Sequence, residues 1–146
     1  MATQKILIGN WKMHPQTDDE ATALFSDVRR SADSLRRARA VVCPPFPYVS
    51  VCAGLTQSDR LSLGAQDAYW EATGSYTGEV SPPMLRSLGV THVIVGHSER
   101  REMGETNADV ARKVRAVRTH KMTPVVCIGE RQRDEEGAYL SFLAEE

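Results

Sequence analysis

The residues best suited to chemistry lie in the segment 92–101, where a short apolar run ends in several polar side chains. The segment opens with His-Val-Ile-Val, which predicts a strand buried on both faces. Gly96 lets the chain turn at a point where the Cβ of any other residue would clash. Ser98 is a favourable N-cap for a following helix. We therefore expect His97 where a buried strand ends and a helix begins. Parallel α/β folds usually bind substrates at that position.

A histidine in this position supports two interpretations. A neutral imidazole can donate a hydrogen bond to the carbonyl oxygen of a substrate and thereby polarise it. Alternatively, His97 is a turn residue whose ring only satisfies backbone groups. A motif of this length is a hypothesis by itself, so both interpretations remain open at this point.

Five apolar runs alternate with helical patterns and would position these residues. The runs predict strands at residues 5–10, 39–43, 61–66, 92–95 and 123–130. Helices are predicted after them, from residues 17–20 onward, at 47–54, 81–89 and 106–120, and from residue 132. Gly64 and Ala65 are small enough for close packing in the third strand. The connection over residues 67–79 is long, and long loops in compact domains are often functional.

Two of these helices show an apolar side and a charged side. In the first, the expected apolar residues are Ala21, Leu24, Val28, Ala32 and Leu35. Its arginines are expected to form a solvated face and not a nucleic-acid site. In the helix over 106–120, the expected apolar stripe is Val110, Val114 and Val117. The basic residues expected outside that stripe are Arg112, Lys113, Arg115 and Arg118.

The alternation of strands and helices predicts an α/β fold with parallel strands and right-handed crossovers. Five such units fit either a complete open sheet or an incomplete (β/α)8 barrel, which needs about 250 residues when full. Neither GxGxxG nor GxxxxGK[ST] occurs, which weakens an open-sheet nucleotide binder. The sequence stops within a predicted helix, which favours the incomplete barrel. Residues 1–146 show no change of composition and are expected to form a single domain.

The composition excludes several classes of protein. With 18 basic and 19 acidic residues and a formal net charge of -1, a general affinity for nucleic acid or membranes is not expected. No apolar run approaches the roughly 18 residues of a membrane span, and no signal-peptide core opens the chain. Cys43, Cys52 and Cys127 are odd in number and form no CxxC pair, which argues against a zinc site. These features predict a cytoplasmic protein without a metal.

Five motifs resemble those of the triosephosphate isomerase family. They are Gly9-Asn10-Trp11-Lys12-Met13, Gly64-Ala65-Gln66-Asp67, Tyr76-Thr77-Gly78-Glu79-Val80-Ser81, Gly96-His97-Ser98-Glu99-Arg100-Arg101 and Cys127-Ile128-Gly129-Glu130. Any one of them alone would be weak, but together they follow the order and spacing of that family from about Lys5 onward. The resemblance implies a (β/α)8 TIM barrel, a homodimer and a role in glycolysis and gluconeogenesis. The implied reaction interconverts dihydroxyacetone phosphate and D-glyceraldehyde 3-phosphate, without cofactor or metal.

The resemblance also implies roles for individual residues. Asn10 and Lys12 match the substrate-binding pair, with Lys12 the cation near the phosphate and the developing enediolate. His97 matches the catalytic electrophile, and Ser98 and Glu99 match the residues behind it. Without the resemblance, Lys12 would be interpreted as a surface lysine and Glu99 as a carboxylate that pairs with Arg100 or Arg101 on the surface.

Further matches lie outside these positions. Cys127 matches a buried cysteine near the catalytic base, although a small apolar core residue is the simpler interpretation. Glu79 and Arg100 match a structural ion pair. The loop Tyr69 to Glu79, with Tyr76, Thr77, Gly78 and Glu79, matches the loop that reaches into the partner subunit.

The sequence departs from the family in what it lacks. The family's catalytic glutamate and its phosphate-binding loops follow strands six to eight, and no glutamate here matches that base. Because proton abstraction beside a carbonyl needs a positioned base, we expect these 146 residues to be inactive alone. We also expect open strand edges that favour oligomers, aggregation or pairing with a complementary fragment.

Two alternatives of other classes compete with an isomerase fragment. The first is a non-catalytic half-barrel that binds another chain through its open sheet or through the loop over residues 69–79. The second is a complete small open-sheet protein that binds a phosphorylated ligand. Only the isomerase interpretation accounts for the order of the motifs.

Overall fold

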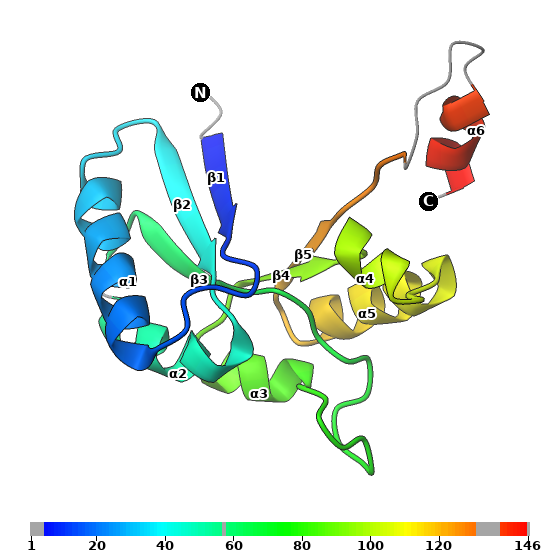
Figure 1. The fold of residues 1–146 in the computed structure, drawn as a ribbon, viewed down its shortest axis with the longest axis horizontal. Helices are drawn as coiled ribbons and strands as arrows, with labels where there is room; N and C mark the ends of the chain where they lie inside the picture. Colours follow the sequence, from blue (N-terminus) through cyan, green and yellow to red (C-terminus); the bar gives the residue numbers. More distant parts are fainter. Residues whose placement is uncertain (1–4, 57, 131–137, 146) are drawn as a thin grey trace.

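Five parallel strands form one curled sheet in a computed structural model that describes residues 5–56, 58–130 and 138–145 (Figure 1). The strands pair in sequence order, each with the next. They are β1 Lys5–Asn10, β2 Ala38–Cys43, β3 Leu61–Ala65, β4 His92–Val95 and β5 Thr123–Val126. The first four agree closely with the predicted runs, whereas β5 ends four residues before the predicted 130. The curled parallel sheet confirms an incomplete TIM barrel as the fold class.

Helices follow the strands and cover one side of the sheet in Figure 1. They are α1 Asp18–Asp33, α2 Phe46–Leu55, α3 Pro82–Ser87, α4 Ser98–Glu102, α5 Asn107–Thr119 and α6 Ala138–Glu145. The helix predicted from residue 132 lies partly outside the described residues, and α6 forms its described part, away from the sheet in Figure 1. None of the described helices is long and apolar enough to cross a membrane.

The helix starts follow from their capping residues. Thr17 accepts a hydrogen bond from the backbone of Glu20 at the start of α1. At the start of α5, Thr106 and Asp109 satisfy each other's backbone N–H groups in a capping box.

One expectation for α1 is wrong. Leu24 is 41% exposed, whereas Phe25, which we did not assign to the core, is fully buried. Phe25 lies four residues after the buried Ala21 and therefore on the same face of the helix. Leu24 precedes Phe25 by one position, and neighbouring side chains of a helix point about 100° apart, so Leu24 points away from that face. Val28 and Leu35 pack against the core as expected.

Alternation along the strands divides the buried side chains between the two faces of the sheet. The larger cluster includes Val42, Val93 and Val95 together with residues of the helices. A smaller cluster on the opposite face contains Val41, Cys43 and Ile94. Successive residues of β4 therefore point to opposite sides, and Val93, Ile94 and Val95 are buried while His92 is half-buried, so burial on both faces is confirmed for the last three residues of this strand.

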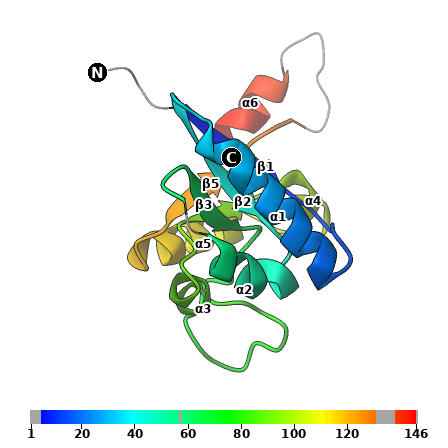
Figure 2. The same cartoon turned by 90° about the vertical axis from the view of Figure 1, so that its left-hand side faces the viewer.

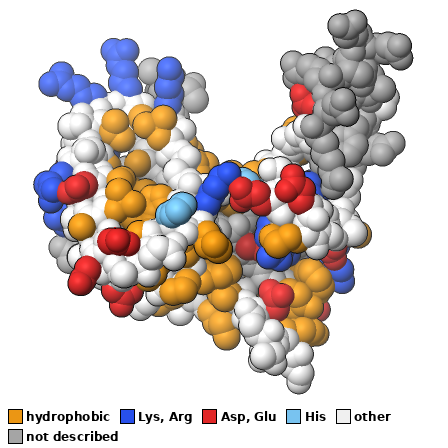
Figure 3. Space-filling view, in the orientation of Figure 1, with side chains coloured by type: hydrophobic (Ala, Val, Ile, Leu, Met, Phe, Trp, Pro, Cys, Tyr) orange, Lys and Arg blue, Asp and Glu red, His pale blue; other side chains and the backbone are white. Residues whose placement is uncertain are grey.

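The two outermost strands carry exposed apolar residues. In β1, Ile6 and Leu7 are each 55% exposed, and Ile128 beyond β5 is 62% exposed. Figure 3 shows hydrophobic side chains on the surface of the lobe that contains β1. The structure thus has the open, apolar strand edges that the sequence predicted.

Candidate functional site

The carboxyl ends of the strands bring together residues that are far apart in the sequence. Asn10 ends β1, Cys43 ends β2, and Gln66 and His97 follow β3 and β4. A backbone hydrogen bond of 3.1 Å from Trp11 to the Cys43 carbonyl ties the exit of β1 to that of β2. The candidate site is therefore formed at the edge of the sheet where parallel folds bind ligands.

Gly96 produces the turn that places His97. Its φ of +71° is unfavourable for residues with a side chain, and a Cβ would come within 3.2 Å of Val110 and of the Arg101 guanidinium. The Gly96 carbonyl also accepts a 2.8 Å hydrogen bond from Arg101 Nε. The prediction that this turn requires glycine is confirmed.

His97, and not Ser98 as we expected, is the N-cap of α4. After the turn at Gly96, His97 directly precedes the first helical residue, so Ser98 already lies in the first turn of the helix. The Nδ1 atom of His97 accepts a 3.3 Å hydrogen bond from the backbone N–H of Glu99. A neutral ring with this acceptor carries its hydrogen on Nε2, which leaves Nε2 as a donor.

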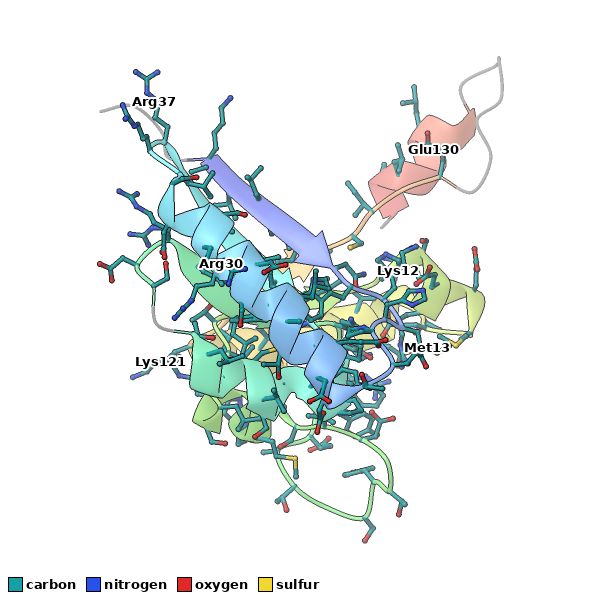
Figure 4. The ribbon with its side chains drawn as sticks, turned by 60° about the vertical axis from the view of Figure 1, so that its left-hand side comes forward. Lys12, Met13, Arg30, Arg37, Lys121 and Glu130 are labelled. Carbon is teal, nitrogen blue, oxygen red and sulfur yellow. The ribbon has the colours of Figure 1, made fainter. Side chains whose placement is uncertain are left out.

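Lys12 lies just beyond β1 and next to α4 (Figure 4). Its φ is +55°, a left-handed conformation that is uncommon for a residue other than glycine. The side-chain oxygen of Asn10 accepts a 2.9 Å hydrogen bond from the Lys12 backbone N–H. The Lys12 ammonium donates a 2.7 Å hydrogen bond to Glu99 Oε1.

Glu99 connects Lys12 with His97. Its carboxylate accepts the hydrogen bond from the Lys12 ammonium, and its backbone N–H donates the hydrogen bond to His97 Nδ1. The hydrogen bond from Lys12 lowers the pKa of Glu99 below its ordinary value. Glu99 therefore contacts the site residues and does not pair with Arg100 or Arg101 on the surface, as one interpretation of the sequence allowed. Ser98 is exposed at the start of α4.

Cys127 lies beyond β5, where its backbone N–H donates a 2.9 Å hydrogen bond to the Val95 carbonyl. It packs against the cluster of Val41, Cys43 and Ile94. Burial raises the pKa of the Cys127 thiol and raises the pKa of Cys43 to about 12. Both cysteines are thus protonated thiols near neutral pH, which suits packing better than nucleophilic chemistry.

The loop between β3 and α3 projects from the body of the protein in two perpendicular views (Figures 1 and 2). Residues 71–79 are exposed, including Tyr76, Thr77, Gly78 and Glu79. The Tyr69 ring lies 4.1 Å from that of Trp70 and 4.7 Å from that of Tyr76. A pocket of about 170 Å³ lies at the base of this loop, lined in part by Tyr69, Trp70, Glu79 and Arg100.

A buried charged cluster beside this pocket corrects two expectations. Lys113 is 2% exposed instead of solvated, and its ammonium contacts Asp67 at 2.7 Å and also Glu105. Arg100 pairs with Asp67, at 3.1 Å, and not with Glu79. Burial raises the pKa of Asp67, and Lys113 and Arg100 oppose that shift. The cluster joins the exit of β3 to α4 and α5.

Sequence reasoning missed the contacts of two residues of this region, Lys113 and Gln66. Lys113 lies three residues after Val110 and four before Val117, so helical spacing alone places it on the buried face. We predicted a solvated Lys113 because of its charge, and that prediction was wrong. Gln66 was quoted within a motif, but nothing in its local pattern indicated its contacts with the backbone of Lys12 and Cys43.

The described residues contain no group of three or more histidine, cysteine, aspartate or glutamate side chains placed to hold a metal ion. The functional groups present at the site are instead an amide, an ammonium, a carboxylate and an imidazole. Such a set can bind an anion and donate hydrogen bonds to a carbonyl oxygen.

Comparison with known proteins identifies similar chains. The family model described as triosephosphate isomerase matches residues 5–146. The triosephosphate isomerase of Chloroflexus aurantiacus is 48% identical over 88% of this chain and 52% of its own length. That of Moorella thermoacetica is 45% identical over 92% of this chain and 53% of its own length. The chain thus spans about half the length of the curated relatives that it matches.

Proposed function

Because the chain belongs to the triosephosphate isomerase family, we propose that it supplies the electrophilic half of an active site for triose phosphate isomerisation. The reaction would interconvert dihydroxyacetone phosphate and D-glyceraldehyde 3-phosphate, a step of glycolysis and gluconeogenesis. The observation that carries the proposal is that Glu99, at the carboxyl ends of the strands, binds Lys12 through its carboxylate and His97 through its backbone N–H. A lysine that is only a surface residue, or a histidine that only satisfies a turn, would not need the shared contact with Glu99 that Lys12 and His97 have.

Each residue has a distinct proposed role. The Nε2–H of His97 donates a hydrogen bond to the substrate carbonyl oxygen and stabilises the negative charge that develops there. The Lys12 ammonium attracts the phosphate and stabilises the same developing charge. Asn10 binds substrate and fixes the Lys12 backbone. Ser98, Glu99 and Cys127 support these groups without reacting.

The reaction also needs a base that removes a proton from the carbon beside the carbonyl. Glu99 is the carboxylate that the described residues place at the site, and it is held by Lys12. We therefore propose that residues 1–146 alone do not turn over substrate. The base and the phosphate-binding loops would come from sequence that corresponds to the other half of the relatives' length.

Residues 1–146 would belong to one domain of a homodimer that needs no cofactor or metal and acts in the cytoplasm. The exposed loop with Tyr76, Thr77, Gly78 and Glu79 would contact the second subunit. Its exposed aromatic residue Tyr76 is of the type enriched in protein interfaces.

The test compares two proteins in an isomerisation assay. One is the 146-residue chain, and the other joins it to the uncovered half of the Chloroflexus aurantiacus relative. We expect turnover from the chimera and none above background from the chain. Circular dichroism and size-exclusion chromatography establish that the chimera folds. Normal turnover by the chain alone, or a folded chimera that is inactive, would contradict the proposal.

A non-catalytic half-barrel that binds another chain is a second candidate. The exposed Ile6, Leu7 and Ile128 at the two ends of the sheet favour it. Co-elution of the chain with one defined partner protein, at a fixed stoichiometry, would support this function. An active chimera would instead favour the isomerase.

A further inference from the structure

The backbone of Lys12 is fixed by two amide side chains from different strands. On its amino side, Asn10 Oδ1 accepts the Lys12 N–H at 2.9 Å. On its carboxyl side, the Lys12 carbonyl accepts a 2.8 Å hydrogen bond from Gln66 Nε2. Both restraints act on a residue at φ +55°, a left-handed conformation that is uncommon for a residue other than glycine.

Gln66 also reaches the end of β2. Its Nε2 group donates a second hydrogen bond, of 2.9 Å, to the Cys43 carbonyl. That carbonyl already accepts the backbone N–H of Trp11 at 3.1 Å. A single side-chain amide therefore ties the exits of β1, β2 and β3 together at Lys12.

We propose that Gln66 is a positioning residue that holds the left-handed backbone of Lys12 and thereby keeps its ammonium group against Glu99. Gln66 does not touch the reacting atoms in this account and acts through Lys12. The inference rests on the proposed function, because it assigns Gln66 to the same site.

The chemistry of this position requires a donor. Two carbonyl oxygens face one group, and the amide of Gln66 supplies both hydrogens. A glutamate of the same shape would place an acceptor against two acceptors. An alanine would leave both carbonyls without this donor. In either variant Lys12 can relax from its left-handed conformation, and its ammonium then separates from Glu99.

The experiment measures the reactivity of the Lys12 amine in the 146-residue chain. The chain is labelled with a trace amount of acetic anhydride, and peptide mass spectrometry gives the extent of labelling at Lys12 relative to the exposed Lys5 and Lys121. We expect Gln66→Ala and Gln66→Glu to raise this ratio about threefold or more, since each removes two hydrogen bonds.

Gln16→Ala is the matched control. Gln16 Nε2 also donates a 2.8 Å hydrogen bond to a backbone carbonyl, that of Met13, but does not contact Lys12. The ratio should remain unchanged in this variant. An equal rise at Lys5, Lys12 and Lys121 in the Gln66 variants would show general loosening and would overturn the proposal, as would an unchanged ratio.

A double substitution separates positioning from general support. In a Glu99→Ala background the Lys12 ammonium is already released, so adding Gln66→Ala should raise its relative labelling no further. Independent, multiplicative effects of the two substitutions would contradict action through the Lys12–Glu99 contact. None of these measurements needs turnover. An inactive chimera would therefore refute the proposed reaction and leave this inference to be decided by labelling.

Discussion

At the scale of single residues, the arrangement of the site depends on Glu99. Its carboxylate holds Lys12 at 2.7 Å and lies near the His97 ring. The pKa of Glu99 is lowered first by the hydrogen bond from Lys12. The stability that this contact contributes is therefore present above the unfolded-state pKa and is lost as the pH falls through the lower folded-state pKa.

A titration tests this linkage. We expect the side-chain carboxyl ¹³C resonance of Glu99, followed by NMR, to titrate below the ordinary value of 4.5. In a Lys12→Met variant the midpoint should rise, because the hydrogen bond that lowers it is gone. An unchanged midpoint in that variant would mean that Lys12 does not hold Glu99 in solution.

The buried Lys113 gives a second prediction at this scale. Lys113→Met leaves the carboxylates of Asp67 and Glu105 without their shared cation in a buried position. We expect the free energy of unfolding to fall by about 3–5 kcal/mol in urea denaturation, the usual result of removing one partner of a buried ion pair.

Lys121→Met is the matched control, because Lys121 is exposed. Its effect should stay within about 0.5 kcal/mol, as for most surface substitutions. Equal effects of the two lysine substitutions would show that the buried cluster contributes no more than an ordinary surface charge.

Residue types and spacing placed Asn10, Lys12 and His97 at strand exits, and the structure confirms that placement. The sequence did not reveal which polar atoms meet. Ser98 has the better capping chemistry, yet the turn at Gly96 makes His97 the cap. The contacts of Gln66 depend on residues more than 20 positions away and leave no periodic signal, whereas helical spacing places Lys113 on the buried face but does not reveal Asp67 as its partner.

At the scale of elements, close packing between β2 and β3 depends on Gly64. A Cβ at this position would lie 2.4 Å from the Cys43 sulfur and 3.0 Å from Val41. The small residues predicted for close packing are thus needed where the two strands meet, and the exit of β2 at Cys43 is also where Gln66 binds.

Substituting two glycines should give opposite results. Gly64→Ala should lower the free energy of unfolding by about 1–3 kcal/mol, because it overpacks the interior. Gly54→Ala in α2 meets no atom within 4 Å and should raise it by about 0.5 kcal/mol through helix propensity. Urea denaturation of both variants provides the measurement. Destabilisation by both substitutions to a similar extent would contradict this account of β2–β3 packing.

Element type and order were predictable because strand and helix periodicities differ clearly along the chain. The buried face of a helix was harder to predict than its position. Leu24 and Phe25 are adjacent and both apolar, so the sequence did not determine which of them faces the core. β5 ends at Val126, which pairs with Val95, the last residue of β4, and local sequence does not report where a neighbouring strand ends.

At the scale of the whole molecule, the sheet has two outer strands, β1 and β5. Strand periodicity fits an open sheet and a barrel equally well, so the prediction of a barrel depended on other features, above all the order of the motifs. Within the described sheet, each outer strand has one edge without a neighbouring strand and carries exposed apolar side chains, a combination that favours association.

This exposure predicts self-association of the 146-residue chain. Leu7→Lys in β1 should lower the oligomeric fraction in sedimentation velocity, because a charge on an edge strand opposes pairing. Met13→Lys, at an exposed residue outside the strand, serves as the control and should leave that fraction unchanged. A chain that is monomeric without any substitution would show that the edges do not drive association.

The most direct test of the proposed site is the turnover number of the chimera carrying His97→Ala. If His97 donates its Nε2–H to the substrate carbonyl, its loss should lower kcat by about 10²–10³-fold while the chimera remains folded, as for other donors to a developing oxyanion. A folded His97→Ala chimera with kcat within about threefold of the unsubstituted one would contradict the assignment of His97 as the electrophile.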